Sequence, residues 1–389
     1  MFEFDLQWLL IGLPVAFALG WAASRLDIRQ GRRADRAAPK AYFKGLNLLL
    51  NEQHDKAIDA FIEAVQSDPD TVELHFALGN LFRRRGEFER AVRVHEHLLQ
   101  RGDLPAAERA RAQHALAQDF VKAGLLDRAD SAYEALEGTA YELEARLARL
   151  SLAERARDWR AAAALATQLE ASGTGSYATR IAHHWCEIAQ QAAAQGNASE
   201  ADDALAQARR IAPQAPRPLL MAARRAQQAG DAAAAYARYA ELIAVAPAML
   251  TLVADEMAGA ALAGGRADAA RELFQRRHEQ QPSTDLLAAL RRLDEARSAS
   301  DAASAATTRA RALLQQQPSL SAALEVLNTL DDAEREPALR GVRDAVARAA
   351  RPLRRYRCAA CGFEAQQHFW QCPGCLGWDT FPPQRIEEL

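Results

Sequence analysis

Four of the five cysteines form two C-x-x-C pairs, separated by ten residues, near the C-terminal end of the 389-residue chain. They are Cys358, Cys361, Cys372 and Cys375. Each short spacing places two thiolates on one tight turn, and two facing turns bring four sulfurs to the corners of a tetrahedron. Gly362 and Gly374 suit turns in which φ is positive and backbone N–H groups point at sulfur. The pattern predicts one metal ion, iron or zinc, and two disulfides are the alternative in an oxidising compartment.

The other end of the chain indicates the compartment. Residues 6–23 form an apolar run without a charged side chain, with Trp8 and Trp21 near its two ends. As a helix this run spans roughly 27 Å, close to the ~30 Å hydrocarbon core of a bilayer, and Pro14 is tolerated in a membrane helix. A cleaved signal peptide is the main alternative, but it begins with a basic segment, and the residues before this run include no Lys or Arg.

Positive charge is concentrated after the apolar run. The basic residues there are Arg25, Arg29, Arg32, Arg33, Arg36 and Lys40. The positive-inside rule then predicts a single-pass membrane protein with its N-terminus outside, on the periplasmic side, and everything beyond residue 25 in the cytoplasm. A reducing compartment favours a metal site over disulfides. The net charge of −3 gives no electrostatic basis for binding nucleic acid.

The middle of the chain repeats with a period near 34, since Gly45 and Gly79 are 34 positions apart, and so are Ala57 and Ala91. Each unit has a small residue in a first helix, a polar turn with Gly, and a small residue in a second helix. These features resemble tetratricopeptide repeats, in which helix pairs stack into a superhelix. Small residues let two helices approach closely, and large side chains such as Phe61 fill the gap to the next unit.

Repeats are predicted to begin near residues 38, 72, 110, 143, 182, 216 and 251. The periodicity is weak after residue 283, where helices are expected over 286–293, 308–317, 320–330 and 338–348, with a loose connection over 298–306.

The inner groove of such an array usually holds a protein segment. The helical phase directs to this groove Asn80, Arg83 and Arg84 of the second repeat and Arg111, His114, Gln118 and Lys122 of the third. These side chains favour an acidic or polar partner segment. The alternative is that the arginines at the end of the second repeat's first helix only complement its dipole.

The C-terminal segment resembles a rubredoxin, because Tyr356 and Trp370 each lie two residues before a cysteine pair and the second pair reads Cys-Pro-Gly-Cys. The ten-residue separation is much shorter than in rubredoxins that carry electrons, so the shell around a redox iron would be thin. A structural site of the zinc-ribbon type is as consistent with the sequence as iron. The aromatic residues Phe363, Phe369, Trp370, Trp378 and Phe381 are expected to pack around the knuckles or to dock them onto the last helices, and His368 is not expected to be a ligand.

The whole chain resembles the lipopolysaccharide assembly protein B family of Gram-negative bacteria. The matching parts are an anchor at 1–24, a basic linker at 25–40, a repeat array at 41–350 and a rubredoxin-like domain at 351–389. The resemblance implies a mainly α fold and a non-enzymatic inner-membrane adaptor that presents the deacetylase LpxC to the membrane protease FtsH. It also implies that the protein coordinates lipopolysaccharide synthesis with assembly and transport, that other lipopolysaccharide assembly proteins are partners, and that the four cysteines bind the family's metal. Formation of a homodimer stays open.

No catalytic motif was found: the sequence has no P-loop, G-x-S-x-G, H-E-x-x-H or dinucleotide fingerprint, so no enzyme activity is expected. Two other functions are considered, namely electron transfer through a four-cysteine iron site in a membrane-tethered protein, and nucleic-acid binding through a zinc ribbon. Near-neutral charge and the anchor argue against the second. His183 and His184 are adjacent on a helix and so point in different directions, and Cys186 is expected to be a buried small hydrophobe.

Overall fold

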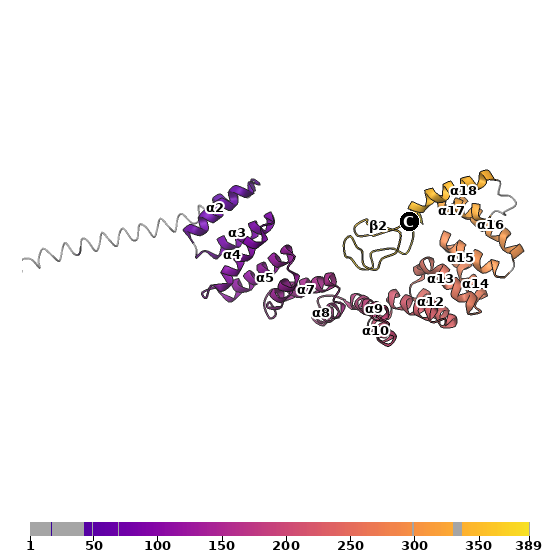
Figure 1. The fold of residues 1–389 in the computed structure, drawn as a ribbon, viewed down its shortest axis with the longest axis horizontal. Helices are drawn as coiled ribbons and strands as arrows, with labels where there is room; N and C mark the ends of the chain where they lie inside the picture. Colours follow the sequence, from indigo (N-terminus) through magenta and orange to yellow (C-terminus); the bar gives the residue numbers. More distant parts are fainter. Residues whose placement is uncertain are drawn as a thin grey trace, which may run out of the picture. The chain divides into compact units, whose positions relative to one another are not determined.

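The computed structural model describes residues 43–48, 50–68, 70–297, 299–329 and 337–388, together with residue 17 (Figure 1). Apart from residue 17, the predicted anchor and basic linker lie outside the described residues. Within those residues, no helix combines the length and the apolar character that crossing a bilayer requires. The chain divides into two compact units, Met1–Asp158 and Trp159–Leu389.

The first unit is a series of antiparallel helices. They are α2 (His54–Ser67), α3 (Val72–Arg85), α4 (Phe88–Gln100), α5 (Ala106–Ala123), α6 (Leu126–Glu134) and α7 (Glu142–Ala156). The helix that opens each repeat, α3, α5 or α7, is called its A helix below. The second-repeat start predicted near 72 coincides with α3, whereas α5 begins four residues before the predicted start near 110.

The second unit continues the helical array and ends in a small β structure. Its helices are α8 (Trp159–Ala171), α9 (Ala178–Ala194), α10 (Ala198–Ile211), α11 (Pro216–Gln228), α12 (Ala232–Val245), α13 (Leu250–Ala263), α14 (Ala267–Gln280), α15 (Thr284–Glu295), α16 (Ala299–Gln316), α17 (Leu320–Thr329) and α18 (Pro337–Ala350), with short 3-10 turns at Pro247–Met249, Arg351–Leu353 and Ile386–Glu388. Its A helices are α9, α11 and α13. The strands β1 (Tyr356–Arg357) and β2 (Glu364–Ala365) belong to the C-terminal segment.

Close helix packing follows from the small residues that set the repeat. A Cβ added to Gly45 would lie 2.7 Å from the ring of Phe61, and one added to Gly79 would lie 2.5 Å from Nε2 of His95. Both distances are shorter than real contacts, so an alanine at either glycine would push the two helices apart. The predicted close approach at the small residues is therefore confirmed, but Phe61 and His95 contact the glycine of their own repeat, whereas the sequence analysis placed such side chains in the gap to the next unit.

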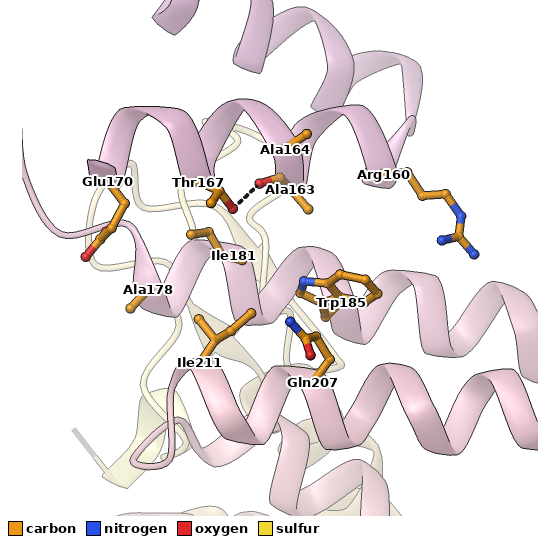
Figure 2. Close-up of a pocket in the computed structure, with 10 residues that line it drawn as sticks. All are labelled: Arg160, Ala163, Ala164, Thr167, Glu170, Ala178, Ile181, Trp185, Gln207 and Ile211. Atoms are coloured by element: carbon orange, nitrogen blue, oxygen red, sulfur yellow. Dashed lines mark hydrogen bonds between the residues drawn. The ribbon is translucent and has the colours of Figure 1, made fainter. Parts of the chain in front are cut away.

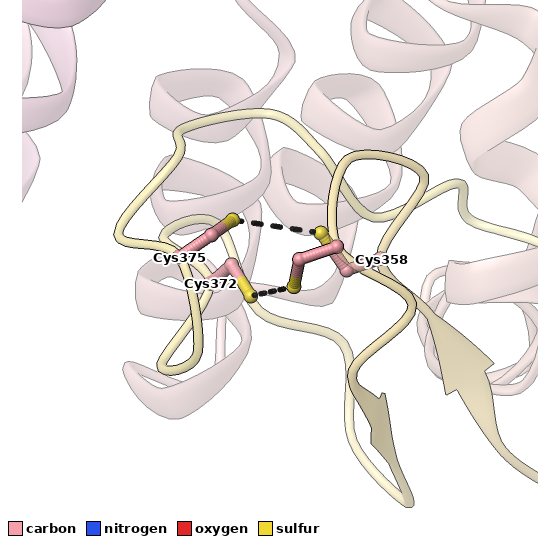
Figure 3. A group of neighbouring side chains, drawn as sticks. Cys358, Cys372 and Cys375 are labelled. Carbon is pink, nitrogen blue, oxygen red and sulfur yellow. Dashed lines mark hydrogen bonds between the residues drawn. The ribbon is translucent and has the colours of Figure 1, made fainter. Parts of the chain in front are cut away.

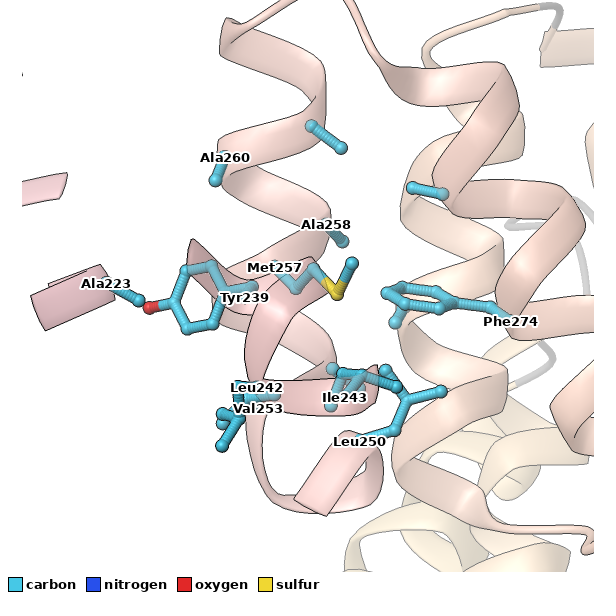
Figure 4. Close-up of a cluster of buried hydrophobic side chains, with 14 of the residues drawn as sticks. Ala223, Tyr239, Leu242, Ile243, Leu250, Val253, Met257, Ala258, Ala260 and Phe274 are labelled. Atoms are coloured by element: carbon cyan, nitrogen blue, oxygen red, sulfur yellow. The ribbon is translucent and has the colours of Figure 1, made fainter. Parts of the chain in front are cut away.

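The largest buried cluster belongs to the second unit and joins α11 to α15. Tyr239 and Phe274 are fully buried in it, and they pack among small and medium side chains that include Ala258 and Met257 (Figure 4). Alanines such as Ala235, Ala258 and Ala270 are part of the same cluster, and their small side chains leave room for the two aromatic rings. This cluster packs α11 to α15 of the second unit together, ahead of the C-terminal segment.

The region after residue 283 is more helical than predicted. Helices α15, α17 and α18 correspond to three expected helices, but the expected loose connection over 298–306 is wrong, because Ala299–Gln316 forms one continuous helix, α16. Its N-terminal half is rich in Ala and contains no Gly or Pro, and alanine is the strongest helix former. The Ala/Ser composition therefore indicated helix and not linker.

Candidate metal centre

The first cysteine pair lies in the loop of a β-hairpin. Strands β1 and β2 are antiparallel, with Tyr356 opposite Ala365 and Arg357 opposite Glu364. The Cys358 N–H donates to the carbonyl of Phe363 (2.9 Å), and the Gly362 N–H donates to the carbonyl of Cys358 (2.9 Å). Gly362 has φ +77°, which is unstrained for glycine.

The second pair repeats this hydrogen-bond pattern. The Cys372 N–H donates to the carbonyl of Gly377 (2.8 Å), and the Leu376 N–H donates to the carbonyl of Cys372 (2.8 Å). The left-handed position that glycine occupies in the first knuckle is here taken by Leu376, with φ +59°. The expectation of a positive φ at Gly374 is therefore wrong, but its N–H does point at sulfur, 3.3 Å from Sγ of Cys372.

The four sulfurs converge at one point. All four Sγ atoms lie within 4.8 Å of one another. Across the two knuckles, Sγ of Cys358 lies 3.8 Å from Sγ of Cys375 (Figure 3). Sγ of Cys361 lies 3.6 Å from Sγ of Cys372. These separations are far longer than a disulfide bond of about 2 Å. They match the edge of a tetrahedron, about 3.8 Å, around a metal with ~2.3 Å bonds to sulfur.

The surroundings favour the thiolate form of Cys358 and the protonated form of Cys361. The hydroxyl of Thr380, together with the backbone N–H groups of Cys361 and Ala360 and against desolvation, lowers the pKa of Cys358 to about 6. The backbone N–H of Phe363 also favours the Cys361 thiolate, but desolvation and the neighbouring sulfurs outweigh it and raise the pKa of Cys361 to about 12. A metal that binds Cys361 as a thiolate would therefore displace a proton from it.

The donor set fits a four-coordinate thiophilic metal, which zinc and iron both are. Cys358 and Cys372 are buried, whereas Cys361 and Cys375 are exposed. Bound there, a metal would supply a crosslink between the two knuckles. His368 does not converge on the sulfurs, since its Nε2 lies 3.0 Å from the carbonyl of Phe381, and burial lowers its pKa.

The aromatic residues dock this four-cysteine segment, called the ribbon below (residues 356–383), onto the middle of the second unit. The ring of Trp378 stacks on His183 of α9 with centroids 4.7 Å apart, and it meets Trp159 of α8 edge-on at 6.2 Å. Leu252 of α13 packs against the ribbon's buried core, which comprises Tyr356, Cys358, Cys372 and Phe381. The expected docking onto the last helices is therefore wrong for Trp378, and Phe363 is 41% exposed and so largely uncovered.

Polar contacts fix the same docking. Nε2 of His183 lies 2.7 Å from Oδ2 of Asp379, and the carboxylate accepts the hydrogen bond. Arg217 of α11 is 3% exposed, donates to Oε1 of Glu187 (2.6 Å), and lies about 6 Å from the ring centroids of Trp370 and Trp378. Sequence reasoning missed this attachment, because His183 and Asp379 are 196 positions apart.

Cys186, on the same helix as His183, is buried as expected, and desolvation raises its pKa to about 12.

The predicted groove residues of the first unit fall into two groups. Arg83 and Arg111 make pairs within the protein: Nη1 of Arg83 donates to Oδ1 of the fully buried Asp119 (2.9 Å), and Arg111 donates to both carboxylate oxygens of Glu73 (2.7 and 3.1 Å). The others lie at or near the surface of their helices: Asn80, His114 and Gln118 are half-buried, and Arg84 and Lys122 are exposed.

The second unit also contains a cavity of about 620 Å³ between α8, α9 and α10 (Figure 2). Trp185 and Ile181 of α9 line it, facing alanines of α8 such as Ala163. At its end, Arg160 pairs with Glu200. Among the residues that line the cavity, no nucleophile lies beside a base, and none belongs to the four-cysteine segment, so the cavity offers a volume but no catalytic group.

Comparison with known proteins gives concordant matches. Residues 356–383 match a family model described as "Rubredoxin metal binding domain". Over 387 residues the chain is 31% identical to "Lipopolysaccharide assembly protein B" of Escherichia coli (strain K12), covering 98% of each chain. It is 27% identical over 398 residues to the protein of the same name from Haemophilus influenzae, covering 98% of this chain and 99% of the relative.

Among solved structures, similar ones include the "TPR2AB-domain:pHSP90-complex of yeast Sti1", with 14% identity, a TM-score of 0.36 and coverage of 68% of this chain and 95% of that chain. Another is Naa15/Naa10 bound to HypK-THB, with 14% identity, a TM-score of 0.41 and coverage of 81% and 47%.

Proposed function

The chain belongs to the lipopolysaccharide assembly protein B family, and from this membership we propose that it is a membrane-tethered scaffold that regulates lipopolysaccharide synthesis by binding proteins. The observation that carries the proposal is the 31% identity over 98% of the chain to a relative named for lipopolysaccharide assembly. The cysteine site supports a structural role, since its four sulfurs converge as a ligand set for one metal and its ribbon packs on the helices of the second unit.

The mechanism that we propose for this regulation is presentation of LpxC to the protease FtsH. A tether increases the effective concentration of two partners without strong affinity for either. The sequence supports this arrangement: residues 25–40 would keep the first repeat within about 50 Å of the membrane. The helical array would hold the partner, and the ribbon would keep the inner helices of the second unit in place.

The test is the half-life of LpxC in the native host, with the protein present and then depleted. Depletion should lengthen the half-life, and complementation should restore it with the native chain and with Phe363→Ala, which alters an exposed ribbon residue. Trp378→Ala, which removes the stacking on His183, should restore it less. An LpxC half-life that does not respond to depletion would contradict the presentation mechanism.

A second function, electron transfer, is favoured by one observation: Cys361 and Cys375 are exposed, so electrons would have a short path to a partner. Metal analysis of protein purified from its native host separates the two functions. Zinc has no redox chemistry and would eliminate electron transfer.

A further inference from the structure

Each A helix of the first unit presents one stripe of half-buried or exposed residues at helical spacing. The stripe of α3 is Glu73, Ala77, Asn80 and Arg84; that of α5 is Ala107, Arg111, His114, Gln118 and Lys122; that of α7 is Glu144, Leu147, Ser151 and Arg155.

Contacts between neighbouring helices show that these stripes share one face. Arg111 of α5 reaches Glu73 of α3 at 2.7 Å, and Nε2 of His114 lies 3.4 Å from Oε2 of Glu144 on α7. The ring of His114 also stacks on Tyr141, with centroids 4.7 Å apart. The acidic residues at the N-terminal ends of the stripes therefore already have basic partners within this face.

The C-terminal ends of the same stripes carry three cations. Arg84, Lys122 and Arg155 each lie two residues before the residue with positive φ that follows the helix, and all three are exposed. Within the described part of the chain, no ion pair involves any of them.

A helix-dipole explanation does not account for this column of charge. Cations favour the C-terminal end of any helix, so the A helices of the second unit should carry them too. The equivalent positions there, two residues before Gly196, Gly230 and Gly265, are Ala194, Gln228 and Ala263. Of these three helices, α11 has a cation elsewhere in its last turn, Arg225, but that cation is paired with Asp202. The basic column is confined to the first unit, which points to a ligand of that unit.

A row of hydrogen-bonding groups runs beside the cations. Asn80, Gln118 and Ser151 lie one helical turn before the three basic residues. Oδ1 of Asn80 accepts a hydrogen bond from Arg83 (2.6 Å), which directs the oxygen inward and leaves its amide N–H groups to donate. Amide and hydroxyl groups of this kind recognise the backbone of an extended chain, and the cations recognise its carboxylates.

The spacing also fits a polypeptide. Packed helices lie roughly 8–10 Å apart, and an extended segment of the polyproline II type brings every third side chain to one face at intervals of about 9 Å. A flat bilayer surface is a poorer fit to the inner face of a repeat superhelix, which is concave.

Building on the proposed scaffold role, we infer that the inner face of the first unit binds an extended acidic polypeptide segment, with carboxylates on Arg84, Lys122 and Arg155 and backbone groups on Asn80, Gln118 and Ser151.

The test measures fluorescence anisotropy of a labelled twelve-residue peptide, four repeats of Asp-Ser-Ala, titrated with the full chain in detergent micelles. Replacing the three cations together (Arg84→Gln, Lys122→Gln and Arg155→Gln) should weaken binding about tenfold or more, since exposed ion pairs contribute up to ~1 kcal/mol each. Raising the salt concentration should weaken binding to the native chain and have less effect on the variant.

The matched control removes three exposed charges elsewhere, with Lys56→Gln, Arg93→Gln and Arg210→Gln, and should bind the peptide like the native chain. Equal affinity for a peptide with Asn in place of Asp, or equal weakening by the control, would overturn the inference. So would tighter binding of short-chain phosphatidylglycerol through the same three residues, since the surface would then serve lipid. If peptide binding fails while depletion still lengthens the LpxC half-life, this inference falls and the proposed function stands.

Discussion

The inner faces of the two units differ in what occupies them. In the second unit, α9, α11 and α13 carry the ribbon, which rests on His183, Arg217 and Leu252. In the first unit, α3, α5 and α7 leave their stripes open to solvent and are joined by ion pairs such as that between Arg111 and Glu73. The same repeat architecture therefore binds the ribbon in the second unit and presents an open polar surface in the first. The difference teaches that side chains on the A helices, and not the repeat itself, decide what the face binds.

The largest expected effect comes from detaching the ribbon from α9, α11 and α13 of the second unit. Cys358→Ser with Cys361→Ser removes two of four ligands, and a structural site of this kind contributes on the order of 10–16 kcal/mol to folding. The ribbon is too small to fold on its own core. We expect loss of bound metal, proteolysis within 356–383 and solvent exposure of Trp370 and Trp378, while the helical circular dichroism is largely kept.

Metal content, limited proteolysis and tryptophan fluorescence measure this prediction. Cys186→Ala is the control, because it removes a buried thiol of the same unit without touching the site, and it should keep the metal. A ribbon that stays protease-resistant without metal would show that the docking contacts alone hold it.

The next largest effect concerns the stability of the first unit, whose helices α3, α4 and α5 are joined by polar contacts. Asp119 is fully buried and accepts from Arg83 (2.9 Å) and from Nδ1 of His95 (2.5 Å). Asp119→Ala should destabilise the first unit by about 3–5 kcal/mol, because it leaves the partly buried guanidinium of Arg83 and the buried ring of His95 without their shared acceptor. Glu73→Ala breaks the more exposed pair with Arg111 and should cost below about 1 kcal/mol. Urea unfolding compares the two, and equal losses would refute the distinction.

The smallest effect is a pH dependence of the first face. Burial, partly offset by Glu144 and reinforced by Arg83, lowers the pKa of His114. The unfolded chain therefore takes up a proton near pH 6.5 that the folded chain resists, so stability falls as the pH drops through about 6.5. Partial solvation keeps the loss below about 1 kcal/mol. Urea unfolding near pH 7 and near pH 5.5 should show a smaller difference for His114→Gln than for the native chain.

The repeat fold could be predicted because its determinants are local. Glycine and alanine at fixed intervals set the helix pairing, as the close approach of Gly79 to His95 shows. Errors arose where composition was ambiguous: the Ala/Ser stretch over 298–306 was expected to be a connection, whereas residues 299–306 belong to α16.

The four sulfurs could be predicted from spacing, but the seat of the ribbon could not. Trp378 meets His183 and Trp159 through contacts that no local pattern encodes. Similarly, Arg83 was expected in the groove, whereas it pairs with Asp119, 36 positions further along the chain. A basic and an acidic residue about one repeat apart on facing helices was the signal available in the sequence.

The docking of the ribbon on α9 also sets an order of events during synthesis. His183 and Asp379 are 196 positions apart, so at roughly 5–20 residues per second the ribosome needs about 10–40 s to make the second contact after the first. During that interval α9, then α11 and α13, are made one after the other, and each lacks its contacts with the ribbon until residue 379 is reached. A chain that stops before Trp378 and Asp379 lacks the side chains that cover His183, so this part of α9 would stay exposed to solvent.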